Sequence, residues 1–346
     1  MNINNQLNIE VDNPILTIAI PTFNGGKTIR RTLDSILTQF DQRIEIIILD
    51  NASTDGTDAI LLEYKSKYSF IKIYSNKTNI GPDANFLMSM RKSQGQFILL
   101  LSDDDVLVEN SLLKIVTFLT NNKNISLAYL STVGFRKEYI DSAHCIDPPL
   151  KLENDICTSN KEEFMKYAGY YWGFLSSYIC SKRDFEAIKN PEQYFGTYWL
   201  QSYIHILCGK KQDALLGLIS GPCIGAGRYV SLPGFDSALV NGVYYKKMLD
   251  YAVKEAGFNK RQLDKLYVWR ICLLGKRDII KERASGMKKT SIKLLIKCTW
   301  RYPEVWIKLY PVFFIPQPIC SLGMKIYKKR KKLLGNIEIN RPGDIN

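Results

Sequence analysis

The sequence has only two histidines, and its eight cysteines are scattered without a CxxC pair or a cluster with histidine. Structural zinc sites and disulfide frameworks require such spacings, so we exclude both and expect a reducing cytosol. The first fourteen residues include Asn, Gln, Glu and Asp, whereas a signal peptide needs an apolar segment there. We therefore expect no secretory signal.

Two phosphate-binding motifs and any long apolar run are also missing. No GxGxxG follows the first predicted strand, and no GxxxxGK followed by Ser or Thr occurs anywhere. Their absence removes the main support for a dinucleotide-binding or P-loop protein. The uncharged stretch from Leu309 to Met324 is 16 residues long and contains three prolines. It is too short and too interrupted to span a bilayer.

The net charge of +13 is unevenly distributed along the 346 residues. Residues 241–335 contain 23 Lys and Arg against 6 Asp and Glu, a balance of +17, whereas the remainder contains 24 against 28, a balance of −4. Such a basic block favours an acidic partner: anionic lipid, nucleic acid or a phosphorylated substrate. We predict two halves of one α/β domain, 1–128 and 129–240, followed by a basic helical region, 241–346.

Four short apolar runs in the first half alternate with segments of helical periodicity. The run at 97–101 is entirely apolar and does not alternate with polar residues, which is typical of a strand buried on both faces of a sheet. Strand, helix, strand, helix in this order predicts right-handed crossovers and a mostly parallel sheet with helices on both faces. The predicted strands are residues 15–20, 44–49, 70–74 and 97–101.

Polar residues follow three of these strands, at 21–24, 50–55 and 103–105. Carboxyl ends of parallel strands share one edge of a sheet, where ligands bind, so we expect a single pocket. Three adjacent carboxylates repel one another unless a cation neutralises them, which makes 103–105 either a cation site or only a capped strand-to-helix loop. Asp50 similarly either accepts from a base or ribose or belongs only to an Asx turn. With a cation on Asp104, the pocket suits a nucleotide diphosphate.

Four motifs occur in order between residues 15 and 108: IPTFNGGKTIRRTLDSI, IIILDNASTDGT, NIGPDANF and GQFILLLSDDDVL. Together they resemble the nucleotide-binding half of family 2 inverting glycosyltransferases of the GT-A fold. The last two are similar to those of abequosyltransferase-like enzymes, which build O-antigen and related bacterial surface polysaccharides. The resemblance implies a Rossmann-like GT-A fold and sugar transfer from a nucleotide diphosphate donor, dependent on Mg²⁺ or Mn²⁺.

The resemblance also implies roles for residues at the matching positions. One group would bind the donor: Pro21, Thr22 and Asn24 at the nucleoside, Asp50 at the base, Asn79, Gly81, Asp83 and Asn85 at the ribose and sugar, and Asp103 at the ribose. Asp104 would ligate the metal, and Asp105 would be a second or water-mediated metal contact. Many family members begin this motif with Asp where the chain has Ser102, which leaves open which carboxylates bind metal directly.

An inverting transfer needs a general base that accepts the proton of the acceptor hydroxyl. The resemblance implies an Asp near the start of an acceptor-side helix, and residues 190–205 lack it. His205 and Glu192 are our candidates, and Asp213 is a further titratable residue, although a lone histidine in an apolar helical run is also typical of a core. If the acceptor is already anionic, such as a polyprenyl phosphate, no base is required.

Two segments of the second half have alternative interpretations. Residues 170–177 are dense in aromatic side chains, which either stack against sugar rings or form part of the core. Arg228 lies in a glycine-containing segment, where it either folds over the diphosphate and assists the leaving group or belongs to a surface turn.

The basic region is predicted to be helical and to lie on a membrane surface. Trp and Tyr at positions 300–310 favour the headgroup layer, and the KKRKK run at 328–332 attracts anionic lipid. A solvated tail or a nucleic-acid patch is the alternative. We predict a cytoplasmic enzyme, peripheral on the inner face of the cell membrane, with a polyprenyl-diphosphate-linked glycan as acceptor and no nucleic-acid partner. Its rivals are a polyprenyl-phosphate glycosyltransferase and a non-catalytic nucleotide- or lipid-binding protein of this fold.

Overall fold

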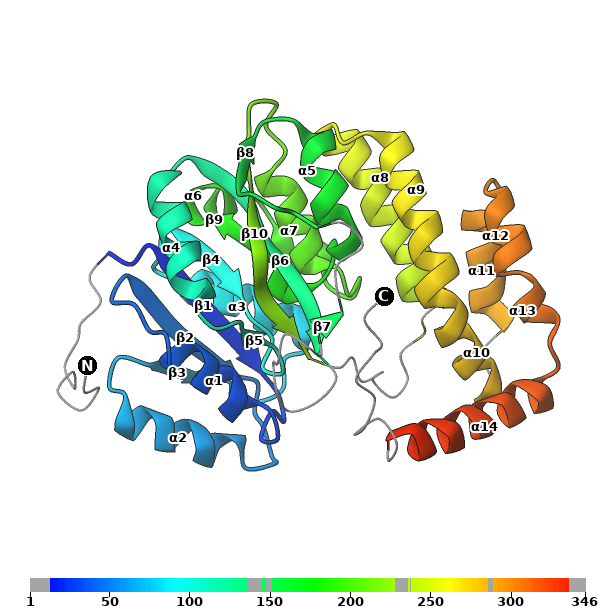
Figure 1. Cartoon of the computed structure of the whole chain (residues 1–346), viewed down its shortest axis with the longest axis horizontal. Coiled ribbons are helices and arrows are strands. Elements are labelled where there is room, and N and C mark those ends of the chain that lie inside the picture. The colour runs from blue at the N-terminus through cyan, green and yellow to red at the C-terminus, as the bar shows by residue number, and fades with distance from the viewer. Residues whose placement is uncertain are drawn as a thin grey trace. The chain divides into compact units, whose positions relative to one another are not determined.

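The computed structural model describes residues 13–135, 145–146, 151–227, 236, 238–285 and 289–335 (Figure 1). By their internal contacts the residues form two compact units. The first is Met1–Val230 with Asp250–Leu263, and the second is Ser231–Leu249 with Asp264–Asn346. Both predicted halves of the α/β domain supply strands to one sheet of the first unit.

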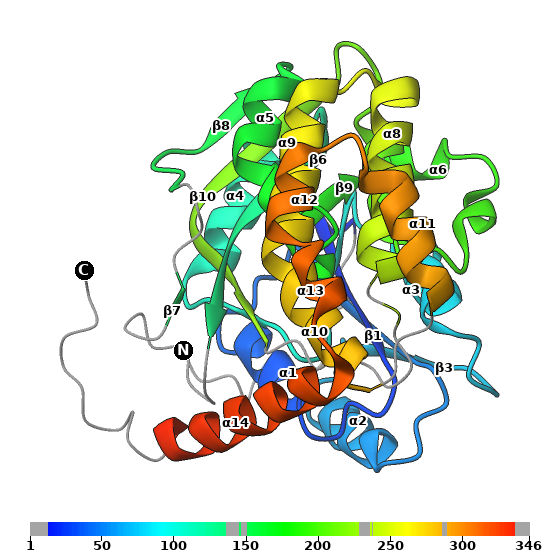
Figure 2. The same cartoon turned by 90° about the vertical axis from the view of Figure 1, so that its right-hand side faces the viewer.

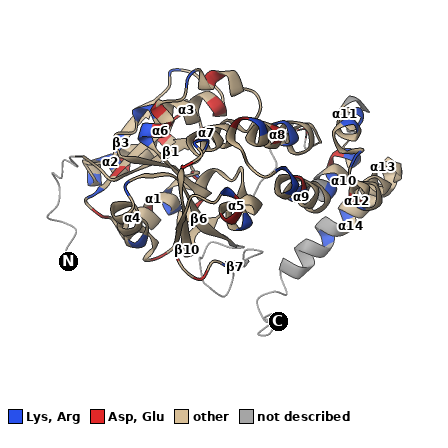
Figure 3. Cartoon of the chain, turned by 90° about the horizontal axis from the view of Figure 1, so that it is seen from above, with Lys and Arg blue, Asp and Glu red and all other residues tan. Residues whose placement is uncertain are grey.

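The four predicted strands are present, and they form the parallel part of this sheet in the order β3-β2-β1-β4. Because consecutive crossovers run first toward β3 and then back to β4, α3 lies on the face opposite to α1 (Figure 3). The predicted α/β fold with a mostly parallel sheet is therefore confirmed. The elements are β1 (Leu16–Thr22), α1 (Ile29–Leu37), β2 (Ile44–Asp50), α2 (Thr57–Lys67), β3 (Lys72–Ser75), α3 (Pro82–Lys92) and β4 (Phe97–Leu100).

Antiparallel pairings extend the sheet beyond β4. The order continues β9-β6-β10-β5, with β9 antiparallel to both β4 and β6, and with β6 parallel to β10. A short acidic loop, residues 102–105, leads from β4 to β5, which pairs with the end of β10. The remaining elements of this unit are β5 (Val106–Leu107), α4 (Ser111–Asn121), β6 (Ile125–Phe135), β7 (Cys145–Ile146), β8 (Ile156–Thr158), α5 (Lys161–Ala168), β9 (Tyr178–Ser181), α6 (Lys182–Glu186), α7 (Leu200–Cys208) and β10 (Leu215–Ala226).

The core of the first unit lies between the parallel strands and their helices. All seven residues of β1 and all seven of β2 are buried, as expected for runs that do not alternate. Even Glu45 in β2 is buried, and it accepts hydrogen bonds from Thr17 Oγ1 (2.5 Å) and Lys72 Nζ (2.8 Å). These contacts satisfy a carboxylate that would otherwise be costly to bury. Side-chain hydrogen bonds of Glu45 thus join β2 to both of its neighbours, β1 and β3.

The second unit is helical, as the sequence predicted, and has a core of its own that includes Ile271, Leu295, Val305 and Leu309. Among the described residues no single helix is long and apolar enough to cross a bilayer. The helices Pro303–Phe314 and Gln317–Ile326 meet that criterion only as a pair, with a 96° bend between them. Helices α8 (Tyr245–Ala256) and α9 (Lys260–Arg270) are divided between the two units, because residues 250–263 belong to the first. The later helices of the second unit are α10 (Lys276–Ala284), α11 (Lys289–Thr299), α12 (Pro303–Lys308), α13 (Pro311–Phe314) and α14 (Gln317–Gly335).

Candidate active site

Helix α1 holds the backbone of the acidic loop. Thr32 Oγ1 donates to the carbonyl oxygens of Asp103 (2.9 Å) and Asp105 (2.7 Å). Arg31 Nη2 donates to the carbonyl oxygen of Asp104 at 3.0 Å. Three successive carbonyls are therefore bound to one helix, which fixes the path of the loop independently of any ligand.

The Asp103 carboxylate is bound to the end of β1. Its Oδ2 accepts a 2.5 Å hydrogen bond from Thr22 Oγ1. Burial, against the opposing effect of the Thr22 hydrogen bond and together with the negative charge of Asp104, raises the pKa of Asp103 to about 6. A Cβ at Gly25 would lie 2.4 Å from Asp103 Oδ2 and 2.5 Å from Thr22 Oγ1, so only glycine fits beside this pair.

Asp105 is a buried residue that joins three parts of the sheet. Its side chain is 1 % exposed. Oδ2 accepts from Ser176 Oγ (2.5 Å), just before β9, and Oδ1 accepts from the backbone N–H of Gly227 (2.6 Å), just after β10. Burial and the charge of Asp104, against the opposing effect of the hydrogen bonds from Ser176 and Gly227, raise the pKa of Asp105 to about 7. The acidic run is not the cap of α4, which begins at Ser111.

The loops after β1 and β2 are bound to each other. The backbone N–H of Asn24 donates to Ser53 Oγ, and Asn24 Oδ1 accepts from the N–H of Thr54, both at 2.8 Å. Asp50 is 5 % exposed and accepts from Ser53 Oγ at 2.5 Å and from its N–H at 3.2 Å. The Asx turn considered for this segment is at Asp55 instead, whose Oδ1 accepts from the N–H of Thr57, two residues on, at 3.2 Å. Pro21 is buried at the end of β1, next to these loops.

Four asparagines form a network beside β2. Asn51 Nδ2 donates to Asn79 Oδ1 (2.9 Å), and Asn76 Nδ2 donates to Asn51 Oδ1 (2.9 Å) and Asn85 Oδ1 (3.0 Å). The N–H of Gly81, whose φ is 83°, also donates to Asn79 Oδ1 (2.8 Å). The predicted Asn79, Gly81 and Asn85 are thus brought together. Asn79, Gly81 and Asn85 were assigned from the family resemblance. Asn51 lies in the polar segment 50–55 but was given no role, and Asn76 was missed, although each directly follows a strand.

Asp83 lies in the first turn of α3 and contacts the segment that precedes α7. Its side chain is 8 % exposed, and Oδ2 accepts a 2.7 Å hydrogen bond from the N–H of Gly196. Burial raises the pKa of this carboxyl group. Because α3 begins at the carboxyl edge of the sheet, Asp83 connects the donor side of that edge to the second half of the domain.

The structure places the two predicted bases unfavourably for proton transfer. Glu192 is exposed and forms an ion pair with Arg91 (2.5 Å), in the last turn of α3, so it lies at the end of that helix opposite to Asp83. His205 is 2 % exposed within α7, and its ring packs 5.0 Å from that of Tyr178. Burial lowers the pKa of His205 to about 3. These positions argue against both residues as the base.

The aromatic run at 170–177 contributes to the core. Trp172 is fully buried and makes an edge-to-face contact with Phe258, with 4.9 Å between ring centroids. A Cβ at Gly173 would lie 2.1 Å from the indole of Trp199. At these positions the core interpretation holds. Arg228, the predicted leaving-group residue, lies outside the described residues.

Two carboxylates of the acidic loop suit a divalent cation. Asp103 and Asp104 are half-buried, and each gives one oxygen to a hydroxyl group: Asp103 to Thr22, and Asp104 to Ser102 at 2.6 Å. The second oxygen of each carboxylate is a hard ligand of the kind Mg²⁺ and Mn²⁺ prefer. Asp105 fits less well, because protein donors bind both of its oxygens. No cluster of three metal-binding side chains occurs among the described residues, which is compatible with Mg²⁺ bound by one or two carboxylates plus substrate phosphates.

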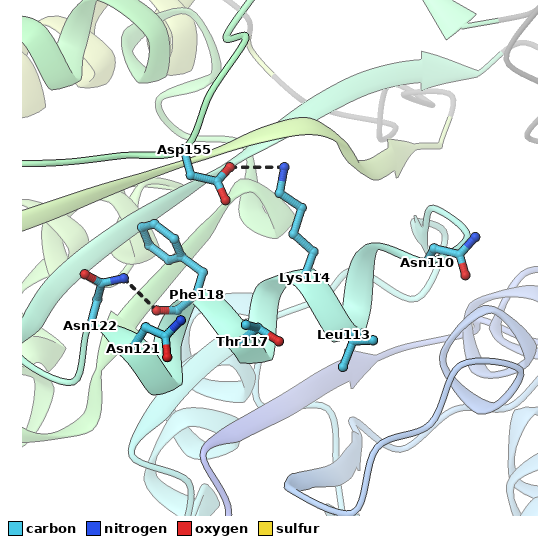
Figure 4. A pocket seen from close by; sticks show the side chains of 8 residues that line it. All are labelled: Asn110, Leu113, Lys114, Thr117, Phe118, Asn121, Asn122 and Asp155. Atoms are coloured by element: carbon cyan, nitrogen blue, oxygen red, sulfur yellow. Dashed lines mark hydrogen bonds and ion pairs between the residues drawn. The ribbon is translucent and has the colours of Figure 1, made fainter.

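A separate hollow lies beside α4 (Figure 4). Lys114 Nζ forms a 3.1 Å ion pair with Asp155 across it and donates to Ser220 Oγ at 2.7 Å. The charges in this hollow are therefore already paired, and none of its lining residues belongs to the predicted site.

Comparisons with known proteins agree with this architecture. A family model described as "Glycosyl transferase family 2" matches residues 17–170. Abequosyltransferase RfbV of Salmonella typhimurium is 30% identical over 220 residues, which are 61% of this chain and 66% of that protein. A Campylobacter jejuni protein named GalNAc(5)-diNAcBac-PP-undecaprenol beta-1,3-glucosyltransferase is 24% identical over 55% of this chain and 60% of its own length. The chain spans roughly half to two thirds of these and similar curated relatives.

Solved structures show the same fold. The crystal structure of S. aureus TarS residues 1–349 in complex with UDP-GlcNAc has a TM-score of 0.61 at 14% identity, covering 88% of this chain and 86% of that one. Mannosyltransferase PcManGT of Pyrobaculum calidifontis, in complex with GDP-Man and Mn²⁺, has a TM-score of 0.51 at 13% identity, covering 94% and 90%. The fold is thus that of the GT-A-type glycosyltransferases. Residues 17–170 form a domain of glycosyltransferase family 2.

Proposed function

We propose that the chain is a metal-dependent inverting glycosyltransferase that moves a sugar from a nucleotide diphosphate to a lipid-linked glycan in bacterial surface polysaccharide synthesis. One observation carries the proposal: the segments after β1, β2 and β4 are hydrogen bonded to one another at a single edge of the sheet. Thr22 binds Asp103, and Asn24 binds Ser53 and Thr54. Such an edge is where open α/β sheets bind ligands.

In this proposal the donor lies along the carboxyl edge. Asp50 and the asparagine network face the base and ribose, and Asp103 and Asp104 lie at the diphosphate. Mg²⁺ or Mn²⁺, when bound by these two carboxylates, would neutralise the charge that develops on the departing nucleotide diphosphate. Thr22 and Ser102 orient the carboxylates by donating to one oxygen of each. Asp105 positions the loop by binding Ser176 and Gly227.

The proton of the acceptor hydroxyl needs an acceptor of its own. We assign this role to Asp83, because it lies at the carboxyl edge and contacts the acceptor-side segment through Gly196. Its raised pKa also makes it a stronger base than an ordinary Asp. Asp83→Asn should reduce kcat by about 100-fold or more while donor binding stays within about threefold. Unchanged kcat would support an acceptor that is already anionic, such as a polyprenyl phosphate.

The acceptor class is supported by the name of one relative. The Campylobacter jejuni relative is named for a PP-undecaprenol-linked substrate, whereas the name of the Salmonella relative, abequosyltransferase, gives the sugar and not the acceptor. We therefore propose a polyprenyl-diphosphate-linked glycan as acceptor, and a peripheral location at the cytoplasmic face of an anionic membrane. Purified protein that glycosylates bare polyprenyl phosphate would instead favour the first alternative, a polyprenyl-phosphate glycosyltransferase.

A donor screen tests the proposed activity. UDP-, GDP-, CDP- and TDP-sugars are incubated with the full chain and Mg²⁺ or Mn²⁺, and release of nucleotide diphosphate is measured. We expect the sugars of one nucleotide to be hydrolysed, and we expect a chelator to abolish this hydrolysis. Asp104→Asn should abolish divalent-dependent nucleotide binding, whereas Asp213→Asn, at an exposed aspartate, should not. Hydrolysis of no donor would support the non-catalytic rival, and Asp104→Asn protein that binds normally would remove the metal assignment.

A further inference from the structure

The last three helices expose large apolar side chains. Phe314 is 84% exposed and Ile307 is 76% exposed, far more than such residues show in a core. Six large apolar side chains exposed on three consecutive helices indicate a surface that binds a partner or a membrane. We call this set the α12–α14 apolar surface: Trp306, Ile307, Phe314, Ile319, Leu322 and Ile326.

The opposite sides of the same helices are packed, so the exposed side chains are not part of a loose segment. Val305 and Leu309 are fully buried in the core of the second unit, and Val312 is buried beside them. At the bend between α13 and α14, Arg283 Nη2 donates to the carbonyl oxygen of Ile315 at 2.8 Å. The fold therefore determines which side of each helix faces outward.

A sharp bend separates α13 from α14, two of the helices that carry the apolar surface (Figure 2). The helical segments on its two sides meet at 96°, and Phe314 is the last residue before the break. After the bend, Ile319, Leu322 and Ile326 follow at spacings of three and four residues, which places them on one face of α14. The most exposed ring of the set therefore lies at the corner, with apolar side chains extending along both arms.

The charge around the α12–α14 apolar surface indicates what binds to it. From Val305 to Gly335 the chain has seven Lys and Arg and no Asp or Glu. Lys308, Lys325 and Lys329 are exposed among the apolar residues, and Lys and Arg mark α11 and α14 in Figure 3. Trp306 is half-exposed while its Nε1–H donates to the carbonyl of Trp300 (2.8 Å). Lys308 forms a 3.4 Å ion pair with Glu304, one turn earlier in α12, so the segment still carries a large excess of cations. Apolar and tryptophan side chains mixed with such an excess match an anionic bilayer interface better than the surface of a protein.

We propose that the corner between α13 and α14 inserts into the headgroup and upper acyl layer of an anionic bilayer. Phe314 enters first, and Lys308, Lys325 and Lys329 contact lipid phosphates. The two arms lie along the interface. This inference specifies how the chain would bind the membrane that we proposed as its partner. It rests on the proposed function only in the expectation that the membrane holds a lipid-linked acceptor.

Vesicle flotation of the full chain tests the insertion. Vesicles of phosphatidylcholine alone are compared with vesicles containing about 30 % phosphatidylglycerol. We expect binding to the anionic vesicles and a loss of about tenfold or more for the triple variant Ile307→Ser, Phe314→Ser and Leu322→Ser. The matched control, Leu62→Ser with Leu113→Ser, removes equally exposed leucines from the first unit and should bind like the wild type. Circular dichroism verifies that each variant is folded.

Several outcomes would overturn the inference. These are wild-type protein that binds neither vesicle, a triple variant that binds as wild type does, or a wild-type dimer that the triple variant converts to monomer without any vesicle binding. Donor hydrolysis in solution separates this inference from the proposed function, because the triple variant should hydrolyse donor at the wild-type rate. Protein that binds vesicles but hydrolyses no donor would leave the insertion standing and remove the proposed activity.

Discussion

The backbone N–H of Gly227 donates a 2.6 Å hydrogen bond to Oδ1 of Asp105, which joins the end of β10 to the loop after β4. The two backbone segments also approach closely here, because a Cβ at Gly227 would lie 2.4 Å from the carbonyl oxygen of Asp104. The acidic motif is therefore completed by the far end of the domain. This contact separates the three aspartates into one positioning residue and two candidate ligands.

Replacement of Asp105 tests whether this residue positions the loop and does not bind the metal. Asp105→Ala leaves the Ser176 hydroxyl and the Gly227 N–H without their buried acceptor, so we expect the free energy of unfolding to fall by about 1–3 kcal/mol. Urea denaturation measures this, with Asp213→Ala as the exposed control. In the folded fraction of Asp105→Asn, the Mn²⁺ concentration for half-maximal nucleotide binding should stay within about twofold of wild type. A tenfold weaker Mn²⁺ affinity would return Asp105 to the metal ligands.

Gly25→Ala tests the contact between β1 and the acidic loop. The added Cβ would overlap both Asp103 Oδ2 and Thr22 Oγ1, so one of them must move and their hydrogen bond must lengthen. We expect kcat/KM to fall by about tenfold or more, with a loss of about 1–3 kcal/mol of stability. Steady-state donor hydrolysis and thermal unfolding measure the two effects. Gly323→Ala, where nothing lies within 4 Å of the new methyl group, should leave donor hydrolysis unchanged; equal rates for the two variants would contradict the assignment.

Asn51→Ala tests the network that the sequence did not reveal. The substitution removes the partner of Asn76, Asn79 and the N–H of Ile80. Loss of these partly buried hydrogen bonds should cost about 1–3 kcal/mol of stability. It should also weaken nucleotide binding, which titration calorimetry measures, by about tenfold. Asn121→Ala, at an exposed asparagine of α4, provides the control, and normal nucleotide affinity of Asn51→Ala would remove the network from the site.

The sequence predicted the donor side of the site better than its connections. Strand ends are visible as apolar runs that stop at polar residues, and this rule found Thr22, Asp50 and Asp103. The same rule would have found Asn51 and Asn76, but side-chain pairs between loops cannot be read from spacing alone. Ser176 and Gly227 were out of reach, because they meet Asp105 only through the order of β9 and β10 in the sheet.

On the acceptor side, the sequence did not determine the role of His205. Its apolar helical surroundings were compatible with either a base or a core residue, and only the packing of α7 on the sheet distinguishes them. Its contact with Tyr178 and its 2 % exposure place it in the core. The distinction depends on tertiary structure, because eight of the nine residues of α7 are buried and the helix has no solvent-facing side that its sequence would reveal.

The pH dependence of stability tests the burial of His205. Its pKa is lowered from 6.5 to about 3 by burial, so between these values the unfolded chain binds a proton that the folded chain does not. Stability contributed by the neutral imidazole is therefore complete above about pH 6.5 and is lost as the pH falls toward 3. His205→Gln removes this term, so the stability difference between wild type and variant should shrink on acidification, by at most about 1.4 kcal/mol per pH unit.

Urea denaturation of wild type and His205→Gln between pH 7.5 and pH 4.5 measures that difference, and His144→Gln, which removes the only other histidine, shows whether the slope belongs to His205. The same variants separate structure from chemistry. A core residue that touches no substrate should leave the acidic limb of the kcat profile in place for His205→Gln, even where the variant is less stable. If instead that limb disappears and kcat falls by about 100-fold, the imidazole is the base and the buried position of α7 is not the one in which the enzyme works.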